Sequence, residues 1–445
     1  MKYLRTLAPF MRRLVLATLA CVVTTQWAAA QEAELRFTIK GGNKSALPIA
    51  VVPFASVSDS DSGNVDIAAV IRSDLERSGQ FNPMPPADMP SQPTSFTAVN
   101  FKDWRVLGQE NLVLGKVMAS GDGGYVVEFR VIDVFKGNQL LGFRIPTSPD
   151  NMRLTAHHIS DLIYETLLHR KGAFATRIAY VTVERPSKKD ALFRLQVADA
   201  DGYDPHTILE SKQPLLSPSW APDGTHLAYV SFEERNSAIY MQDIRTGKRE
   251  KIVSGTGINS APSFAPDGQR LVVTLSRDGN PEIYTYSLAS RQLTRLTYHA
   301  SIDTEAIYSP DGRQIYFTSD RGGGPQIYRM SADGGTPQRV TFNMGNYNSR
   351  ARISADGKKL ALVHGGNGGF GIGVLDLTTN SFDVLSKSSL DESPSFAPNG
   401  DMIIYATMGG RGTELAAISV DGRQGPRMAM QRGEVREPAW GPFRN

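Results

Sequence analysis

Short apolar runs and tight-turn residues alternate at a fixed spacing through the second half of the chain. The phrase Pro218-Ser-Trp-Ala-Pro-Asp-Gly224 returns with substitutions in copies that start at Pro262, Ala306, Ala351, Pro394 and Pro438, so successive copies begin 43 to 45 residues apart. Each copy but the last is followed by a strand-like apolar stretch, such as Leu227–Val230 or Leu271–Thr274. A repeat of this length with several short strands is typical of a β-propeller blade.

The centre of each copy has the chemistry of a tight turn. Proline presets φ, aspartate bonds to nearby backbone N–H groups, and glycine takes a positive φ. A large residue precedes each turn and is placed to pack between blades: Trp220, Phe264, Tyr308, Ile353, Phe396 and Trp440. We interpret the repeated Asp223, Asp267, Asp311 and Asp356 as turn residues, since a catalytic role would not require so many copies.

The two ends of the repeat complement each other. Three strands are predicted at 178–183, 193–198 and 206–209 with no phrase before them, and the phrase at Pro438 has no strands after it. The C-terminal strand is therefore expected to complete the first blade, which leaves no open edge in the ring. The sequence predicts an all-β, six-bladed β-propeller over residues 175–445.

The residues before the propeller do not repeat. Residues 48–54 have the pattern of a buried strand, and 66–78 and 152–168 have helical apolar spacing. Strands are predicted at 111–118, 125–135 and 139–145, with a hairpin near 121–124. We expect a smaller α/β domain with a mixed sheet over residues 47–174.

The N-terminus has the pattern of a secretory signal peptide over residues 1–30. Four basic residues precede an apolar run that is too short to span a bilayer, and small residues permit cleavage after Ala30 or Ala33. Residues 31–46 form an extended N-terminal segment that could be mobile or could add as a strand to a partner's sheet.

Composition excludes several classes of function. The whole chain has a net charge of +3. Because the signal contributes four positive residues and no acidic ones, the chain without the signal carries −1 and has no basic excess to bind nucleic acid. The only cysteine, Cys21, lies in the signal, in a poor lipid-anchor context, so disulfides and cysteine chemistry are not expected. No later segment is long and apolar enough to span a membrane.

Candidate chemistry is weak throughout the chain. No Gly-x-Ser-x-Gly elbow is present, the adjacent His157 and His158 point to different sides of a helix, and the acidic runs 59–63 and 199–204 lack the glutamate of a full calcium loop. A carbohydrate-active or lyase-type propeller enzyme, with Asp391 and Glu392 as its nearest acid pair, is the rival hypothesis. We predict no catalytic residues, no cofactor and no metal.

The loops that lead into the innermost strand of each blade share one face around the central channel. Six converging loops on a rigid scaffold form a natural binding site. Solvated loops with no partner are the alternative. The predicted site comprises Ile258, Asn259, Ser260, Asp303, Thr304, Glu305, Asn348, Arg350, Asp391, Glu392, Arg436 and Glu437.

The order of these parts resembles the TolB family of the Tol–Pal envelope system. The resemblance rests on the phrase Pro48-Ile-Ala-Val-Val-Pro-Phe54, on the propeller phrases and on Leu390–Gly400, and it covers the chain after the signal. It implies a monomeric periplasmic adaptor that supports outer-membrane integrity and constriction during cell division.

The same resemblance implies two binding sites. The lipoprotein Pal is expected at the channel mouth, with contact positions at Ile258, Asn259, Thr304 and Glu305, although Ile258 replaces an expected histidine. The C-terminal domain of TolA is expected on the extended segment, and other outer-membrane proteins are further candidates. The predicted TolA-binding residues are Glu34, Leu35, Arg36, Phe37, Thr38, Ile39 and Lys40.

Overall fold

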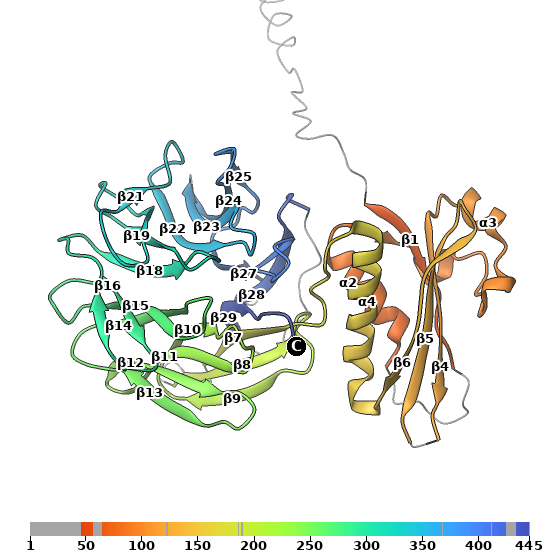
Figure 1. The fold of residues 1–445 in the computed structure, drawn as a ribbon, viewed down its shortest axis with the longest axis horizontal. Coiled ribbons are helices and arrows are strands. Elements are labelled where there is room, and N and C mark those ends of the chain that lie inside the picture. Colours follow the sequence, from red (N-terminus) through yellow and green to blue (C-terminus); the bar gives the residue numbers. More distant parts are fainter. Residues whose placement is uncertain are drawn as a thin grey trace, which may run out of the picture. The chain divides into compact units, whose positions relative to one another are not determined.

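The computed structural model describes residues 46–56, 65–121, 123–185, 187, 190–366, 368–410, 412–423 and 433–444 (Figure 1). The predicted signal peptide, the segment 34–40 and the acidic run 59–63 lie outside these residues. Ala46–Asn445 forms one compact unit. Within the described ranges, no helix combines the length and the apolar character needed to cross a bilayer.

The first domain is built on a mixed sheet, as the sequence predicted. Its strands are β1 (Leu47–Val51), β2 (Ala55–Ser56), β3 (Phe81–Pro83), β4 (Asn111–Ala119), β5 (Tyr125–Asp133) and β6 (Asn138–Thr147). The order is β3-β1-β4-β5-β6, with β2 beside β4. β1 runs parallel to β3 and β4, whereas β4, β5 and β6 are antiparallel.

Two helices cover one face of this sheet. α2 (Ile67–Arg77) begins at Asp66, whose side chain caps the backbone N–H of Ala69, and α4 (Met152–Leu168) packs beside it (Figure 1). Their apolar stripes meet the inward residues of the strands, including Val113 and Phe129, in one core cluster.

The opposite face of the sheet is covered by a segment that the sequence did not resolve. α3 (Phe101–Val106) buries Trp104 against Leu112 and Ile132, and the short 3-10 helices Pro86–Asp88 and Phe96–Ala98 precede it. A third 3-10 helix, Pro149–Asn151, leads into α4. α3 is only 6 residues long, which is too short for a helical period to stand out in the sequence.

Five antiparallel blades follow one another along the chain. The second blade comprises β10 (Leu215–Trp220), β11 (His226–Glu234), β12 (Asn236–Asp243) and β13 (Arg249–Val253). The third comprises β14 (Asn259–Phe264), β15 (Arg270–Leu275), β16 (Glu282–Ser287) and β17 (Leu293–Arg295). The fourth comprises β18 (Asp303–Tyr308), β19 (Gln314–Ser319), β20 (Gln326–Ser331) and β21 (Gln338–Arg339). The fifth comprises β22 (Tyr347–Ile353), β23 (Lys359–Gly366), β24 (Gly369–Asp376) and β25 (Phe382–Val384). The described part of the sixth comprises β26 (Asp391–Phe396), β27 (Met402–Gly409) and β28 (Gly412–Ser419).

The remaining blade is closed by the C-terminal strand, which confirms the prediction. It comprises β29 (Glu434–Trp440), β7 (Arg177–Glu184), β8 (Leu192–Asp199) and β9 (His206–Ser211), in that order. β29 pairs antiparallel with β7, so that Trp440 lies opposite Ile178. The indole Nε1 of Trp440 donates to Thr176 Oγ1 at 2.8 Å and fixes the end of the strand. We call this the closing blade.

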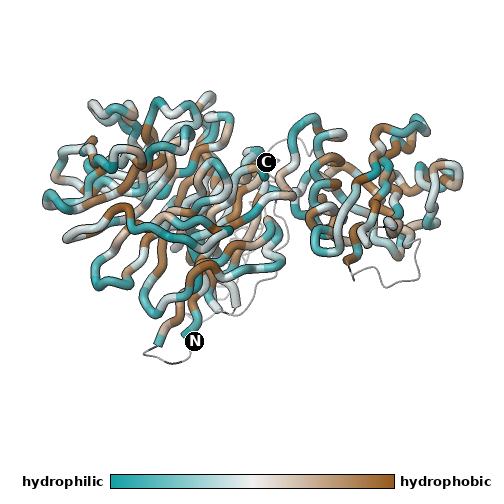
Figure 2. Tube along the Cα trace, turned by 60° about the horizontal axis from the view of Figure 1, so that its bottom comes forward, coloured by the Kyte–Doolittle hydropathy of each residue, from teal (hydrophilic) through white to brown (hydrophobic). Residues whose placement is uncertain are grey.

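The repeated phrase has the two functions that its chemistry predicted. The glycine of each turn has a φ between 68° and 75°, at Gly224, Gly268, Gly312, Gly357 and Gly400. The Asp223 carboxylate accepts from the N–H of Thr225 at 2.7 Å, as a turn aspartate should. The large residues before the turns pack between blades, as Phe264 does against Val230. Brown, hydrophobic stretches in Figure 2 accordingly follow the strands.

Candidate protein-binding site at the propeller channel

The innermost strands of all six blades share one backbone irregularity. In each of them the pairing register shifts, and one non-glycine residue at the shift has φ between 49° and 55°. These bulge residues are Ser217, Ala261, Glu305, Arg350, Ser393 and Glu437. A β-bulge re-aims its side chain and bends its strand. Because the irregularity recurs in every blade, it is part of the architecture of the channel wall.

Two residues before the bulge, four blades carry a buried polar side chain. These anchor residues are Asn259, Asp303, Asn348 and Asp391, and none is more than 3% exposed. The other two blades have buried Leu215 and Val435 at this position. This position is therefore buried in all six blades, whether its side chain is polar or apolar.

The anchor residues bond to their own loops and, at Asn259, also to the preceding blade. Asn259 Nδ2 donates to the carbonyl of Ser237 at 2.8 Å and to that of Gly255 at 3.1 Å. Asp391 accepts from the hydroxyl groups of Ser386 at 2.7 Å and Thr407 at 2.6 Å. Such bonds satisfy buried polar groups and fix the loop backbone.

The other two anchors are held in the same manner. The Asp303 carboxylate accepts from Arg321 Nη2 at 2.6 Å, and Asn348 Nδ2 donates to Gln326 Oε1 at 3.0 Å. The sequence predicted all four anchors as contact residues, but their side chains have no surface to offer a partner. They act on the site by positioning the residues around them.

The residue just before each anchor faces outward. Ile258 is 47% exposed and Ile302 is 48% exposed, whereas Tyr347 and Leu390 are half-buried. We call these four the outer residues. Hydrogen bonds fix the backbone beneath them: the N–H of Ile258 donates to Ser276 Oγ at 2.7 Å, and that of Ile302 donates to Asp320 at 2.9 Å. The loops therefore display apolar side chains on a rigid backbone.

Two further apolar side chains extend this surface. Tyr298 is 73% exposed and Phe342 is 54% exposed. Each follows the outermost strand of its blade, in the loop that leads to the next innermost strand, β18 or β22. Together with the outer residues they place apolar groups on what we call the channel face.

An ion cluster fills the channel beneath this face. Arg350 lies 2.7 Å from Glu305 Oε1 and 2.8 Å from Glu437 Oε2, and it also donates to Ser393. These groups belong to the fourth, fifth, sixth and closing blades, so one guanidinium links four of the six blades. A cavity of about 170 Å³ remains between the inner strands.

Burial and pairing set the charges of this cluster. Burial alone would lower the pKa of Arg350, but Glu437 and Glu305 outweigh it and raise that pKa. Burial would raise the pKa of Glu437, but Arg350 holds it below its usual range. The neighbouring Arg352 is different, because burial, and then Arg350, lower its pKa. Arg350 and Glu437 are thus charged together at neutral pH.

The remaining predicted residues have mixed surroundings. Ser260, Thr304 and Glu392 are half-buried between an anchor and a bulge, and Arg436 pairs with Glu434 at 2.7 Å. Asp391, half of the acid pair in the rival enzyme hypothesis, is held by three hydroxyl groups and is 1% exposed. It is committed to its loop and is not placed to reach a substrate.

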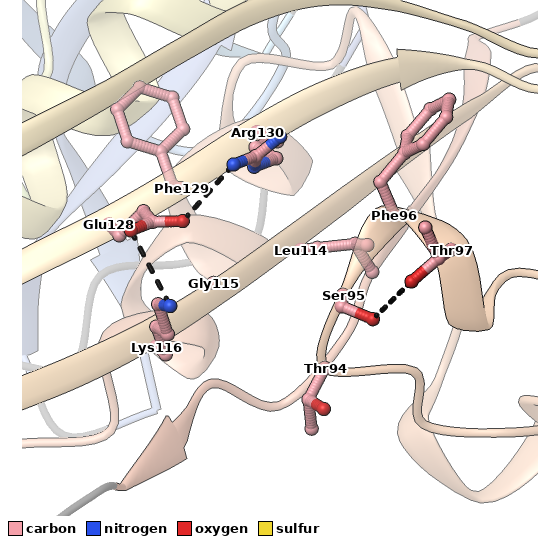
Figure 3. A pocket seen from close by; sticks show the side chains of 10 residues that line it. All are labelled: Thr94, Ser95, Phe96, Thr97, Leu114, Gly115, Lys116, Glu128, Phe129 and Arg130. Atoms are coloured by element: carbon pink, nitrogen blue, oxygen red, sulfur yellow. Dashed lines mark hydrogen bonds and ion pairs between the residues drawn. The ribbon is translucent and has the colours of Figure 1, made fainter.

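A second pocket lies in the α/β domain and was not predicted. A cavity of about 230 Å³ separates the segment Thr94–Thr97 from β4 and β5 (Figure 3). Glu128 on its wall lies 3.5 Å from Lys116 and 3.4 Å from Arg130, and Arg144 approaches it at 3.2 Å. The charges there are engaged with one another.

Comparison with known proteins follows the two domains. Family models described as the TolB amino-terminal domain and the TolB beta propeller domain match residues 35–140 and 164–444, respectively. The Tol-Pal system protein TolB of Xanthomonas euvesicatoria pv. vesicatoria is 56% identical over 433 residues, which are 96% of this chain and 98% of that relative. The corresponding protein of Xanthomonas campestris pv. campestris is 56% identical over 432 residues, with the same coverage. The crystal structure of TolB from Acinetobacter baumannii aligns with a TM-score of 0.82 at 42% identity, over 90% of this chain and 97% of that one.

Proposed function

Because the chain belongs to the TolB family, we propose that it is a periplasmic adaptor of the Tol–Pal system that binds Pal on the channel face and TolA through residues 34–40. In this role it supports outer-membrane integrity and constriction during cell division, and it performs no catalysis. The observation that carries the proposal is the channel face itself, where apolar side chains stand on loops fixed by buried anchors.

The channel face has the properties of a protein-binding surface. Because the backbone beneath these apolar side chains is already fixed by hydrogen bonds, less loop-ordering entropy opposes association. Ile258, Ile302, Tyr298 and Phe342 supply such groups, and half-buried Glu305 adds a charge beside them. A partner that covers them with a complementary apolar surface would place them at the centre of a contact, where binding energy concentrates.

The anchor residues contribute indirectly in this proposal. Asn259 and Asp303 position Ile258 and Ile302, so their substitution should weaken Pal binding through the loop geometry. Charge reversal at Asp303 is a poor test, because a lysine there would be buried and would destabilise the fourth blade.

A direct test uses the outer residues. Ile302→Asp should weaken binding of the purified periplasmic domain of Pal about tenfold or more, measured by isothermal titration calorimetry, because it replaces a central apolar contact with a charge. Val106→Asp is the matched control, since Val106 is 79% exposed but lies in the α/β domain. An affinity of Ile302→Asp within twofold of that of the unchanged protein would refute Pal binding on this face.

The TolA site is tested by deletion. Removing residues 34–44 should abolish binding of the TolA C-terminal domain in the same assay. Thermal unfolding should barely change, because this segment precedes the compact unit that starts at Ala46. Retained TolA binding, or a loss of several degrees in Tm, would contradict an N-terminal TolA site.

A further inference from the structure

A buried polar cluster joins the two helices of the α/β domain. Asp74 on α2 and His157 on α4 are both 0% exposed, and Asp74 Oδ2 lies 2.7 Å from His157 Nδ1. Ser160 Oγ donates to the same oxygen at 2.8 Å, and Arg77 donates to Oδ1 at 2.7 Å. An ionised carboxylate only accepts hydrogen bonds, so Nδ1 carries a hydrogen. The sequence indicated only that His157 and the adjacent His158 point to different sides of a helix.

The other ring nitrogen of His157 faces the propeller. Its Nε2 lies 3.8 Å from Oδ2 of Asp201, which belongs to the turn between β8 and β9 of the closing blade. Arg153 of α4 also donates to Asp201. Nε2 is buried and has no hydrogen-bond partner in the described part of the chain. A buried polar atom without a partner costs about 1–3 kcal/mol, so this atom is a point of conflict in the structure.

One proton resolves the conflict. In the neutral ring, Nδ1 holds the only hydrogen and Nε2 turns a lone pair toward a carboxylate, which offers no donor. In the protonated ring, Nε2 becomes a donor directed to the same region, and closure of the 3.8 Å gap by less than 1 Å makes a charge-assisted hydrogen bond. We propose that His157 is a proton-controlled latch that adds a second bond from α4 to Asp201 of the closing blade when protonated and withdraws that bond when neutral.

All charged neighbours act on this proton. α2 contributes Asp74 and Arg77, α4 contributes Arg153 and Asp161, and the β8–β9 turn contributes Asp201. Burial would lower the pKa of His157, but Asp74 and then Asp201 outweigh it and Arg77, so the pKa is raised above 6.5. A raised histidine pKa means that the stabilisation is complete below about pH 6.5 and is lost as the pH rises through the folded-state value.

Asp161 lies near His157 and also titrates, so its contribution to the pH dependence has to be distinguished from that of His157. Burial raises the pKa of Asp161 to about 6 although the N–H groups of Phe174 and Ala175 bond to its carboxylate. Its ionisation therefore removes stability between about pH 4 and pH 6, and is nearly complete by pH 7. A comparison between variants at the same pH removes this contribution.

A second contact remains when the latch opens. Tyr164 of α4 donates to Asp401 of the sixth blade at 2.8 Å, and Asn399 Nδ2 donates to the carbonyl of Lys171 at 2.9 Å. Neither contact contains a histidine. At the Asp201 side, Arg153 stays bonded to Asp201 and lies 3.9 Å from the Tyr203 ring centroid. Loss of the His157 proton should therefore loosen this side without opening it, while the Asp401 side persists.

A metal ion is the alternative occupant. Ligand atoms of Asp74, His157 and Asp201 lie within 4.8 Å of one another. However, Arg77 and Arg153 already place a positive charge on each carboxylate, so a divalent cation would add uncompensated charge in a buried place. A proton on His157 adds only one positive charge, and the carboxylates of Asp74 and Asp201 both stabilise it.

The latch is tested by distance measurements on the full chain after the signal. That part of the sequence has no cysteine, so spin labels can be placed at exposed Lys102 and Ser290, one in each domain. The distance distribution from double electron–electron resonance should be narrow at pH 6 and broader at pH 8. His157→Gln should remove this pH dependence, whereas His158→Gln, at the exposed neighbouring position of α4, should retain it.

Asp201→Asn provides the second variant. This variant leaves Asp74 and its three hydrogen-bond partners intact, so it tests the latch even where His157→Gln fails to fold. It should also remove the pH dependence of the distance distribution. An unchanged distribution in the original protein between pH 6 and pH 8, or a full response in Asp201→Asn, would overturn the proposal. A rise in Tm on addition of Zn²⁺ at pH 7.5 that His157→Gln abolishes would identify a metal site and overturn it as well.

Discussion

Removal of the guanidinium from the channel is the sharpest test of what stabilises the ring. Arg350→Met keeps much of the side-chain volume but deletes the guanidinium that pairs with both Glu305 and Glu437. Breaking one side of a buried ion pair costs about 3–5 kcal/mol, because the remaining charge is uncompensated. The glutamate side chains keep 14–22% of their surface, so water screens them partly and we expect about 3 kcal/mol.

The assay is urea unfolding at two pH values. At about pH 7.5 the loss should be near 3 kcal/mol, and at about pH 3, below the ordinary glutamate pKa of about 4.3, it should be clearly smaller. The sign follows from Glu437, whose pKa is depressed by Arg350, so that its stabilisation exists at higher pH and is lost as the pH falls.

Arg352→Met is the matched control. Arg352 is as deeply placed in the channel wall, but its only hydrogen bond in the described structure goes to the carbonyl of Ala351, and burial lowers its pKa. Its removal should change stability by about 1 kcal/mol or less. A loss below about 1 kcal/mol for Arg350→Met at pH 7.5, or the same loss at both pH values, would refute the view that this ion cluster ties the blades together.

Two further changes test the closure and the sheet of the first domain. Deleting residues 434–445 removes β29 and should expose the edge of β7, so that amide exchange there becomes fast and the Tm falls by several degrees; slow exchange in β7 would mean that the ring does not need this strand. Gly115→Ala should cost about 1–3 kcal/mol in urea unfolding, because its Cβ would lie 2.2 Å from the Phe54 ring. Gly121→Ala, with nothing within 4 Å, should cost far less, and equal losses would contradict the predicted clash.

Much of the fold could be predicted because its signals are local and repeated. The turn glycines and the interleaved large residues recur every 44 residues or so, and each reports a backbone angle or a packing position. The closure by β29 followed from counting strands at the two ends. α3 could not be predicted, because one turn and a half of helix is stabilised by Trp104 entering a core that the sequence alone does not assemble.

The sequence predicted binding loops at the channel mouth, and partner binding there stays a prediction. The burial of individual side chains in these loops was not predicted. Polar residues were taken as contacts because polar side chains are usually exposed. Asn259, Asp303, Asn348 and Asp391 are exceptions. Asp303 and Asp391 accept hydrogen bonds from their own blades, whereas Asn259 and Asn348 donate to the preceding blade. One signal was available: each stands at the same place in the repeat as the apolar residues Leu215 and Val435, and a position that accepts both is more often buried.

The closing blade connects the channel with the proposed latch. Glu437 of the ion cluster lies on β29, which pairs with β7, and β7 pairs with β8, which ends at Asp199, two residues before Asp201. A change at Glu437 therefore needs to cross only two strand pairings to reach the joint. A hydrogen-bonded sheet has one arrangement and can transmit a displacement, but it cannot by itself supply two states. The two states have to come from a place where a contact is left unmade, and the 3.8 Å gap between His157 Nε2 and Asp201 is such a place among the described residues that link the domains.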